Sequence, residues 1–212
     1  MCGIVGYVGE KQAANFLIDG LTKLEYRGYD SAGIAVFDGE KINVAKSVGR
    51  LAALKEKIKN NTPEGVMGIG HTRWATHGRP SDVNSHPHTD CSGKFAIVHN
   101  GIIENFMSLK EELIAKGHKF VSETDTEVVA HLIEDVYEGD FVEAVNKVLN
   151  RIEGSYSLAF MCQDYPDTLI CTKKDNPLVI GLGEGENFIA SDIPAIIAYT
   201  RRTYIMNDGE IA

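Results

Sequence analysis

The chain has 212 residues (23.2 kDa), of which 43% are hydrophobic and 24% charged, a composition typical of globular proteins rather than disordered ones. The net charge of −9 and the pI of about 5.2 argue against nucleic acid or an anionic membrane as the main partner. The apolar runs are too short to cross a bilayer, no secretory signal is visible, and the four cysteines form no CxxC pair. We therefore expect a cytoplasmic protein.

The first half of the chain alternates apolar runs of strand length with segments of helical spacing. In chain order we expect a strand at Gly3–Val8, a helix at Lys11–Tyr26, strands at Ser31–Phe37 and Lys41–Val48, a helix at Leu51–Asn60, and strands at Val66–Thr72 and Phe95–His99. The Asp38-Gly39 pair is a hairpin signal. A loop rich in His, Pro and Gly is expected from Arg73 to Gly93.

The second half begins with helices and ends with strands. Helices are expected at Asn105–Lys116, from about Thr124, where Thr124 and Glu127 form a capping-box pattern, and from Asp140. Strands are expected at Ser155–Gln163, Thr168–Lys173, Leu178–Gly183 and Phe188–Ala190. Because few helices separate consecutive strands, the sequence predicts an α+β fold with mostly antiparallel pairing.

Cys2 is a candidate nucleophile because of its position. A small residue at position two permits removal of Met1, which leaves Cys2 as the amino terminus. An N-terminal cysteine carries its own base, because an α-amine with a pKa of about 7.7–8.0 can take the thiol proton. The alternative is a structural cysteine that happens to follow Met1.

Asn100-Gly101 follows the strand expected to end at His99, and the pair has two interpretations. Asn-Gly is a strong signal for a hairpin turn. Alternatively, the Asn100 side-chain amide and the Gly101 backbone N–H form an oxyanion hole, because two donors aimed at one point stabilise a tetrahedral intermediate. The segment after Gly101 looks more like the entry to a helix than a second hairpin strand.

Arg73 and Asp125 could together bind an α-amino acid. Arg73, next to the only tryptophan, Trp74, lies at a strand end, and a guanidinium can hold a carboxylate through two parallel hydrogen bonds. Asp125 is expected in the first turn of a helix, where it could bind an ammonium group. The alternatives are a surface arginine beside an interface tryptophan and an acidic residue that complements the helix dipole.

Five histidines are concentrated in one stretch of the chain: His71, His77, His86, His88 and His99. A metal site is one interpretation, but no HExxH or CxxC pattern accompanies them. We expect them to be hydrogen-bonded histidines or residues of a substrate loop. The sequence therefore predicts no metal and no cofactor.

Taken together, these motifs resemble the glucosamine-6-phosphate synthase family, whose glutaminase domains are class II glutamine amidotransferases of the N-terminal nucleophile hydrolase type. The resemblance rests on the opening Met1–Gly6 and on motifs at Glu25–Gly33, His71–Gly78, Ser85–His88, His99–Asn105, Ser122–Glu127 and Gly181–Asp192. It implies a four-layer αββα sandwich of two mostly antiparallel sheets.

The resemblance also implies a role for each candidate residue. Cys2 would attack the glutamine side-chain amide, release ammonia and form a γ-glutamyl thioester that water hydrolyses to glutamate. Asn100 and Gly101 would form the oxyanion hole, and Arg73 and Asp125 would bind the glutamine carboxylate and amino group. The loop over the site would be lined or shaped by Trp74, Thr76, His77 and His86. The terminus would be placed by Arg27 and Gly28.

Full-length enzymes of this family continue into two sugar-isomerase domains that bind fructose 6-phosphate. We expect residues 1–212 to form one glutaminase domain without them, supplying ammonia for glucosamine 6-phosphate synthesis in a homo-oligomeric enzyme. The partners expected are L-glutamine and those isomerase domains, with neither nucleic acid nor membrane. The alternatives are the glutaminase domain of another class II amidotransferase and a non-catalytic glutamine-binding domain.

Overall fold

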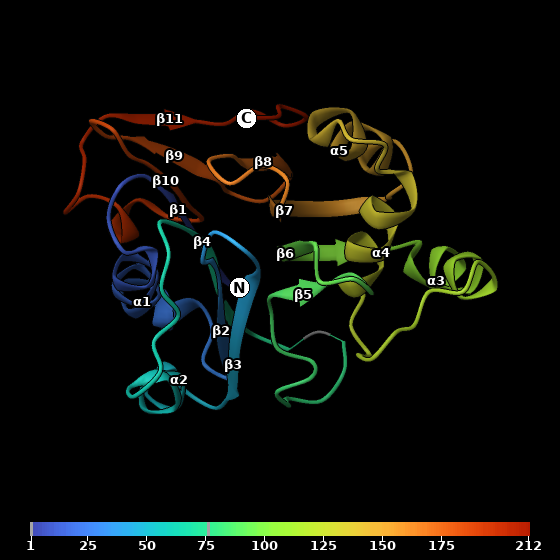
Figure 1. The fold of residues 1–212 in the computed structure, drawn as a ribbon, viewed down its shortest axis with the longest axis horizontal. Coiled ribbons are helices and arrows are strands. Elements are labelled where there is room, and N and C mark those ends of the chain that lie inside the picture. The colour runs from blue at the N-terminus through green and yellow to red at the C-terminus, as the bar shows by residue number, and fades with distance from the viewer. Residues whose placement is uncertain (1, 76) are drawn as a thin grey trace.

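A computed structural model describes residues 2–75 and 77–212. Two antiparallel sheets are stacked face to face, and helices cover their outer faces (Figure 1). The four-layer αββα arrangement expected from the sequence is confirmed. Thr76, one of the expected substrate-loop residues, lies outside the described residues, as does Met1.

The larger sheet has seven strands in the order β11-β9-β10-β1-β4-β2-β3. Its strands are β1 (Gly3–Val8), β2 (Ser31–Phe37), β3 (Ile42–Val48), β4 (Met67–Arg73), β9 (Val179–Leu182), β10 (Asn187–Ala190) and β11 (Thr203–Ile205). β1 lies at its centre, between β10 and β4, and is almost completely buried. The residue that precedes it, Cys2, is therefore held at the end of a central strand.

The smaller sheet has four strands in the order β5-β6-β7-β8. They are β5 (His88–Thr89), β6 (Phe95–Ile103), β7 (Gly154–Cys162) and β8 (Leu169–Lys174). A core of buried apolar side chains fills the space between the sheets, with Ile4 and Ile69 from the larger sheet and Val98 and Met161 from the smaller one. This core joins the sheets, so that residues at the ends of β1, β4 and β6 come together.

The helices divide between the two outer faces. α1 (Ala13–Leu24) and α2 (Leu51–Ile58) pack their apolar sides on the larger sheet. α3 (Phe106–Ala115), α4 (Glu127–Val136) and α5 (Phe141–Leu149) cover the smaller sheet on the opposite side of the molecule (Figure 1). Two short 3₁₀ turns complete the fold, η1 (Glu25–Arg27) and η2 (Ile193–Ala195). No helix in the described part of the chain is long and apolar enough to cross a bilayer.

Two local expectations are wrong, both where tertiary contacts replace a local pattern. The segment after Gly101 is not the entry to a helix, because β6 continues to Ile103 and pairs with β7, and the same pairing excludes the hairpin-turn interpretation of Asn100-Gly101. The capping box is also absent, since α4 begins at Glu127 and the Glu127 carboxylate accepts hydrogen bonds from the backbone N–H groups of residues 121 and 122. Thr124 instead hydrogen-bonds the His88 ring, 3.1 Å away.

Candidate active site

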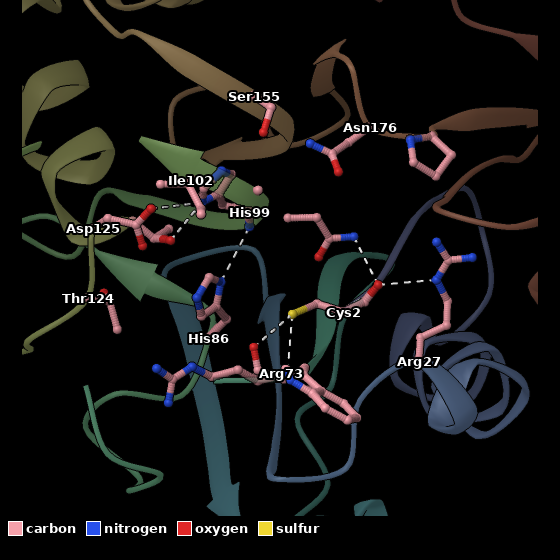
Figure 2. Close-up of a pocket in the computed structure, with 15 residues that line it drawn as sticks. Cys2, Arg27, Arg73, His86, His99, Ile102, Thr124, Asp125, Ser155 and Asn176 are labelled. Atoms are coloured by element: carbon pink, nitrogen blue, oxygen red, sulfur yellow. Dashed lines mark hydrogen bonds and ion pairs between the residues drawn. The ribbon is translucent and has the colours of Figure 1, made fainter. Parts of the chain in front are cut away.

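A cavity of about 290 Å³ opens where β1 begins, and residues from both sheets line it. The predicted residues on its wall are Cys2, Arg27, Arg73, Trp74 and His86, joined by Asn100, Gly101 and Asp125 from the side of the smaller sheet. Figure 2 shows these contributions converging on one space, with Ser155 and Asn176 closing the side opposite Cys2. Sequence positions as distant as 2 and 125 therefore share one cavity.

The Cys2 thiol is held against the strand end that follows Arg73. Its Sγ accepts a hydrogen bond from the Trp74 backbone N–H, with an N···S distance of 3.1 Å, and lies 3.5 Å from the Trp74 carbonyl oxygen. Burial raises the pKa of the Cys2 thiol above its ordinary value, and the Trp74 N–H acts in the opposite direction. The resting thiol is therefore protonated near neutral pH and needs a base before it can attack.

Two donors fix the backbone of Cys2. The Asn100 side-chain amide donates to the Cys2 carbonyl oxygen at 3.1 Å, and Arg27 Nε donates to the same oxygen at 3.3 Å. The Arg27 guanidinium is buried and in turn pairs with the Asp192 carboxylate at 2.7 Å. Both donors therefore hold the carbonyl of Cys2, a residue on the cavity wall, in a set orientation.

Gly28 lies beside this anchor but not on the cavity wall. A Cβ added at Gly28 would lie 2.7 Å from the Arg73 carbonyl carbon and 2.8 Å from the Arg73 oxygen. Only glycine lets the chain after η1 pass this close to the end of β4. Gly28 therefore packs against the end of β4, and its role in placing the terminus stays a prediction.

The Asn100 amide is oriented by a residue that the sequence analysis gave no role. His71 Nε2 lies 3.0 Å from Asn100 Oδ1 and 3.0 Å from the His99 carbonyl oxygen, so it donates to both. Burial lowers the pKa of His71 to about 3, which keeps the ring neutral. With Oδ1 fixed in this way, the Asn100 NH₂ group faces Cys2. The signal was present in the His71–Gly78 motif, but only the contact between β4 and β6 shows the function.

Gly101 provides the second predicted donor of the oxyanion hole. Its φ of +125° lies in the region that favours glycine, and an added Cβ would lie 2.0 Å from the Ser155 carbonyl oxygen. Only glycine at position 101 therefore lets β6 pair this closely with β7 at the cavity. Asn100 and Gly101 are adjacent on one strand and both line the cavity.

Arg73 is buried and carries an unused donor. Its Nη2 donates to the carbonyl oxygens of His77 and Gly78, the latter at 3.2 Å. Its Nη1 is buried with no hydrogen-bond partner among the described residues. An unpaired buried guanidinium N–H is costly, so this position on the cavity wall favours an anionic ligand group.

Asp125 is likewise buried at the cavity, although it precedes α4 instead of occupying its first turn. One carboxylate oxygen accepts from the Ile103 backbone N–H at 2.8 Å, which ties the residue to β6. The other lies 3.8 Å from His77 Nδ1. Burial lowers the pKa of His99, and the nearby Asp125 carboxylate acts against this shift. The site therefore offers a buried carboxylate and a buried guanidinium in one cavity.

The remaining predicted loop residues differ in their burial and in whether they line the cavity. The Trp74 side chain is half-exposed and packs edge-on against Tyr29, with ring centroids 5.3 Å apart. His86 is buried, stacks on His71 at 4.1 Å, and accepts from the His99 backbone N–H. His77 does not line the cavity. Its ring packs on Phe106, and its carbonyl accepts from Arg73. His77 therefore supports the arginine instead of facing the cavity.

Sequence reasoning missed part of the wall. Ile102, Ser155, Asn176 and Pro177 line the cavity, and the last three come from strand ends and loops of the smaller sheet. These residues form no motif, and their place depends on the pairing of β6 with β7 and on the connection from β8 to β9.

Comparisons with known proteins show which family and which solved structures this chain is similar to. A family model described as "Glutamine amidotransferase domain" matches residues 71–198. The chain is 61% identical over 212 residues to a glutamine–fructose-6-phosphate aminotransferase (isomerizing) from Caldanaerobacter subterraneus subsp. tengcongensis and 53% identical over 211 residues to one from Thermus thermophilus. Both matches cover 100% of this chain and 35% of the relative, so the chain spans about a third of their length.

Solved structures are similar over the whole chain. A glutamine phosphoribosylpyrophosphate amidotransferase from B. subtilis, complexed with ADP and GMP, superposes with a TM-score of 0.82 at 29% identity, over 100% of this chain and 48% of that one. A structure described as the allosteric regulatory enzyme of purine biosynthesis gives a TM-score of 0.85 at 30% identity, over 99% of this chain and 46% of that one.

Proposed function

Because the chain belongs to the glutamine amidotransferase domain family, we propose that it hydrolyses L-glutamine to L-glutamate and ammonia, with Cys2 as the nucleophile. Its α+β fold is of the N-terminal nucleophile hydrolase type, like that of the solved relatives. One observation carries the proposal. The Cys2 thiol, the Asn100 amide, the Arg73 guanidinium and the Asp125 carboxylate line a single cavity.

Attack begins with transfer of the thiol proton. Once Met1 is removed, the Cys2 α-amine takes this proton, and Sγ forms a bond to the side-chain carbonyl carbon of glutamine. The carbon–nitrogen bond then breaks, and the proton passes to the departing nitrogen, which leaves as ammonia. Water hydrolyses the thioester, which releases glutamate and returns the proton to sulfur. A raised thiol pKa makes this internal base necessary.

The oxyanion of the tetrahedral intermediate would be held by Asn100 and Gly101. The Asn100 amide carries two N–H bonds, and the Cys2 carbonyl oxygen occupies one of them. The second remains for the substrate oxygen, next to the Gly101 N–H on the same strand. His71 holds the amide in this orientation, so the donor does not have to reorient during the reaction.

The other end of glutamine would be held by the two buried charges. Arg73 Nη1, with no other partner among the described residues, binds the α-carboxylate. Asp125, whose second oxygen is not used by the β6 backbone, binds the α-ammonium group. Trp74 covers the cavity from the loop after β4.

In the whole protein, the ammonia would serve glucosamine 6-phosphate synthesis from fructose 6-phosphate, as the names of the full-length relatives suggest. This part of the proposal includes further isomerase domains as partners and a homo-oligomeric enzyme. It also includes a cytoplasmic location, which is supported by the absence of disulfides among the four cysteines.

The test is glutamate release from glutamine by protein whose intact mass shows that Met1 is absent. We expect turnover, its loss in Cys2→Ala, and near-inactivity of any fraction that retains Met1. Turnover by Cys2→Ala would refute the assignment of the nucleophile. Glutamine binding without turnover in the Met-free protein would indicate a non-catalytic binding domain. Joining the chain to a downstream isomerase segment and assaying glucosamine 6-phosphate separates this enzyme from other class II amidotransferases.

A further inference from the structure

A second group of reactive side chains lies outside the cavity, on the face of the smaller sheet that the helices cover. Cys91 is in the turn between β5 and β6, His118 follows α3, and His131 and Glu134 lie one turn apart on α4. Their ligand atoms all lie within 4.8 Å of one another. Three separate segments thus bring a thiol, two imidazoles and a carboxylate to one point.

Four of the ligand–ligand distances lie close to those of a tetrahedral metal centre. Cys91 Sγ lies 3.6 Å from His131 Nδ1 and 4.0 Å from His118 Nδ1. The Glu134 oxygen lies 3.0 Å from His118 Nδ1 and 3.5 Å from His131 Nδ1. Tetrahedral zinc with ordinary bond lengths places sulfur about 3.6 Å from nitrogen, and nitrogen about 3.3 Å from oxygen.

The outer ring nitrogens face carboxylates, as in metal-bound histidines. His131 Nε2 is buried and lies 3.6 Å from the Glu127 carboxylate, and His118 Nε2 lies 3.8 Å from Asp135. With an ion bound, these carboxylates would hold the Nε2 protons and leave both Nδ1 lone pairs for the metal.

Two backbone N–H groups fix Cys91 against the other ligands. The Lys119 N–H donates to Cys91 Sγ at 3.3 Å, and the Cys91 N–H donates to the Glu134 oxygen at 3.2 Å. A thiolate and a carboxylate together balance the charge of one divalent ion. Thiolate and imidazole ligands favour zinc over magnesium or calcium, which prefer oxygen.

We propose that Cys91, His118, His131 and Glu134 bind one zinc ion. Because all four ligands come from the protein, the site is structural, with no open position for substrate. It joins the turn before β6 to α4 and to the segment that connects α3 with α4, which carries Asp125 shortly before α4 begins. Neither histidine is among the five that the sequence analysis considered for a metal site.

The test uses the chain after dialysis against a chelator, titrated with Zn²⁺ and, separately, with Co²⁺. We expect one ion per chain, a thiolate-to-cobalt charge-transfer band, ligand-field bands of tetrahedral Co²⁺, and a higher unfolding temperature with Zn²⁺. Cys91→Ser, a change at an exposed residue, should lose the charge-transfer band and weaken zinc binding by at least about 100-fold, because it removes a direct ligand.

The matched control is Cys2→Ser, which removes the other thiol that is not buried. It should keep the zinc stoichiometry and the cobalt spectrum. The proposal is overturned if the chain binds no stoichiometric zinc, if Cys91→Ser binds it as well as the unchanged chain, or if Cys2→Ser loses it. His131→Gln changes a buried residue and could prevent folding, so His118→Gln at a less buried position serves as the second ligand variant.

Discussion

Asn100→Ala should reduce the glutaminase kcat far more than it reduces stability. The change removes the amide that donates to the Cys2 carbonyl oxygen and that we propose donates to the oxyanion. Loss of one oxyanion-hole donor typically lowers kcat by about 10²–10³-fold, or about 3–4 kcal/mol of transition-state stabilisation. The effect on KM should be small, because the oxyanion forms only after binding.

The stability cost can be worked out from the partners that remain. His71 Nε2 keeps its hydrogen bond to the His99 carbonyl at 3.0 Å, and the Cys2 carbonyl keeps the one from Arg27 at 3.3 Å. No buried group is left unpaired, so the loss of two hydrogen bonds should cost about 1–2 kcal/mol. Glutamate release at saturating glutamine gives kcat, and urea unfolding gives the free energy of unfolding.

Asn105→Ala is the matched control. Asn105 also makes two hydrogen bonds, from Nδ2 to the Arg151 carbonyl at 2.8 Å and from the Glu153 N–H to Oδ1 at 3.0 Å, but it does not line the cavity. We expect similar destabilisation with kcat unchanged. Asn100 is not an oxyanion donor if Asn100→Ala keeps more than about a tenth of kcat, a loss well below that of such a donor, or if both variants lose kcat equally.

Three further outcomes follow from the same geometry. Arg73→Lys should raise the KM for glutamine by about 10–100-fold with a smaller change in kcat, because lysine cannot reproduce a paired guanidinium contact, and an unchanged KM in steady-state assays would contradict it. Gly28→Ala should cost about 1–3 kcal/mol in urea unfolding, since its Cβ would meet the Arg73 backbone at 2.7 Å, and wild-type stability would contradict the packing argument. Stability should fall as pH drops below about 6.5, because the unfolded chain gains a proton at His71 while the folded ring, with a pKa of about 3, does not. His71→Gln should make this fall shallower by about 1.4 kcal/mol per pH unit, measured by urea unfolding between pH 6 and pH 4, and an unchanged slope would show that His71 does not titrate in this way.

Local pattern was sufficient where an element is long or has its own end signals. β1 and β2 have the predicted bounds, and Asp140 caps α5 through the Glu143 N–H, at the predicted start. The two-residue β5 and three-residue β11 were not predicted, because strands this short have no periodicity and depend on a neighbour for their hydrogen bonds. The hairpin-turn interpretation of Asn100-Gly101 does not hold, because pairing with β7 overrides the dipeptide preference.

The fold class, the family and the candidate site residues follow from the amino-acid pattern, since they depend on residue types in short motifs around Cys2, Arg73, Asn100 and Asp125. How these residues lie relative to one another depends on the tertiary structure. His71 orients Asn100 because β4 faces β6, and Cys91 meets His131 because a turn of the smaller sheet lies against α4. Such contacts join residues far apart in the chain, and the packing of sheets and helices, rather than sequence spacing, sets their distances.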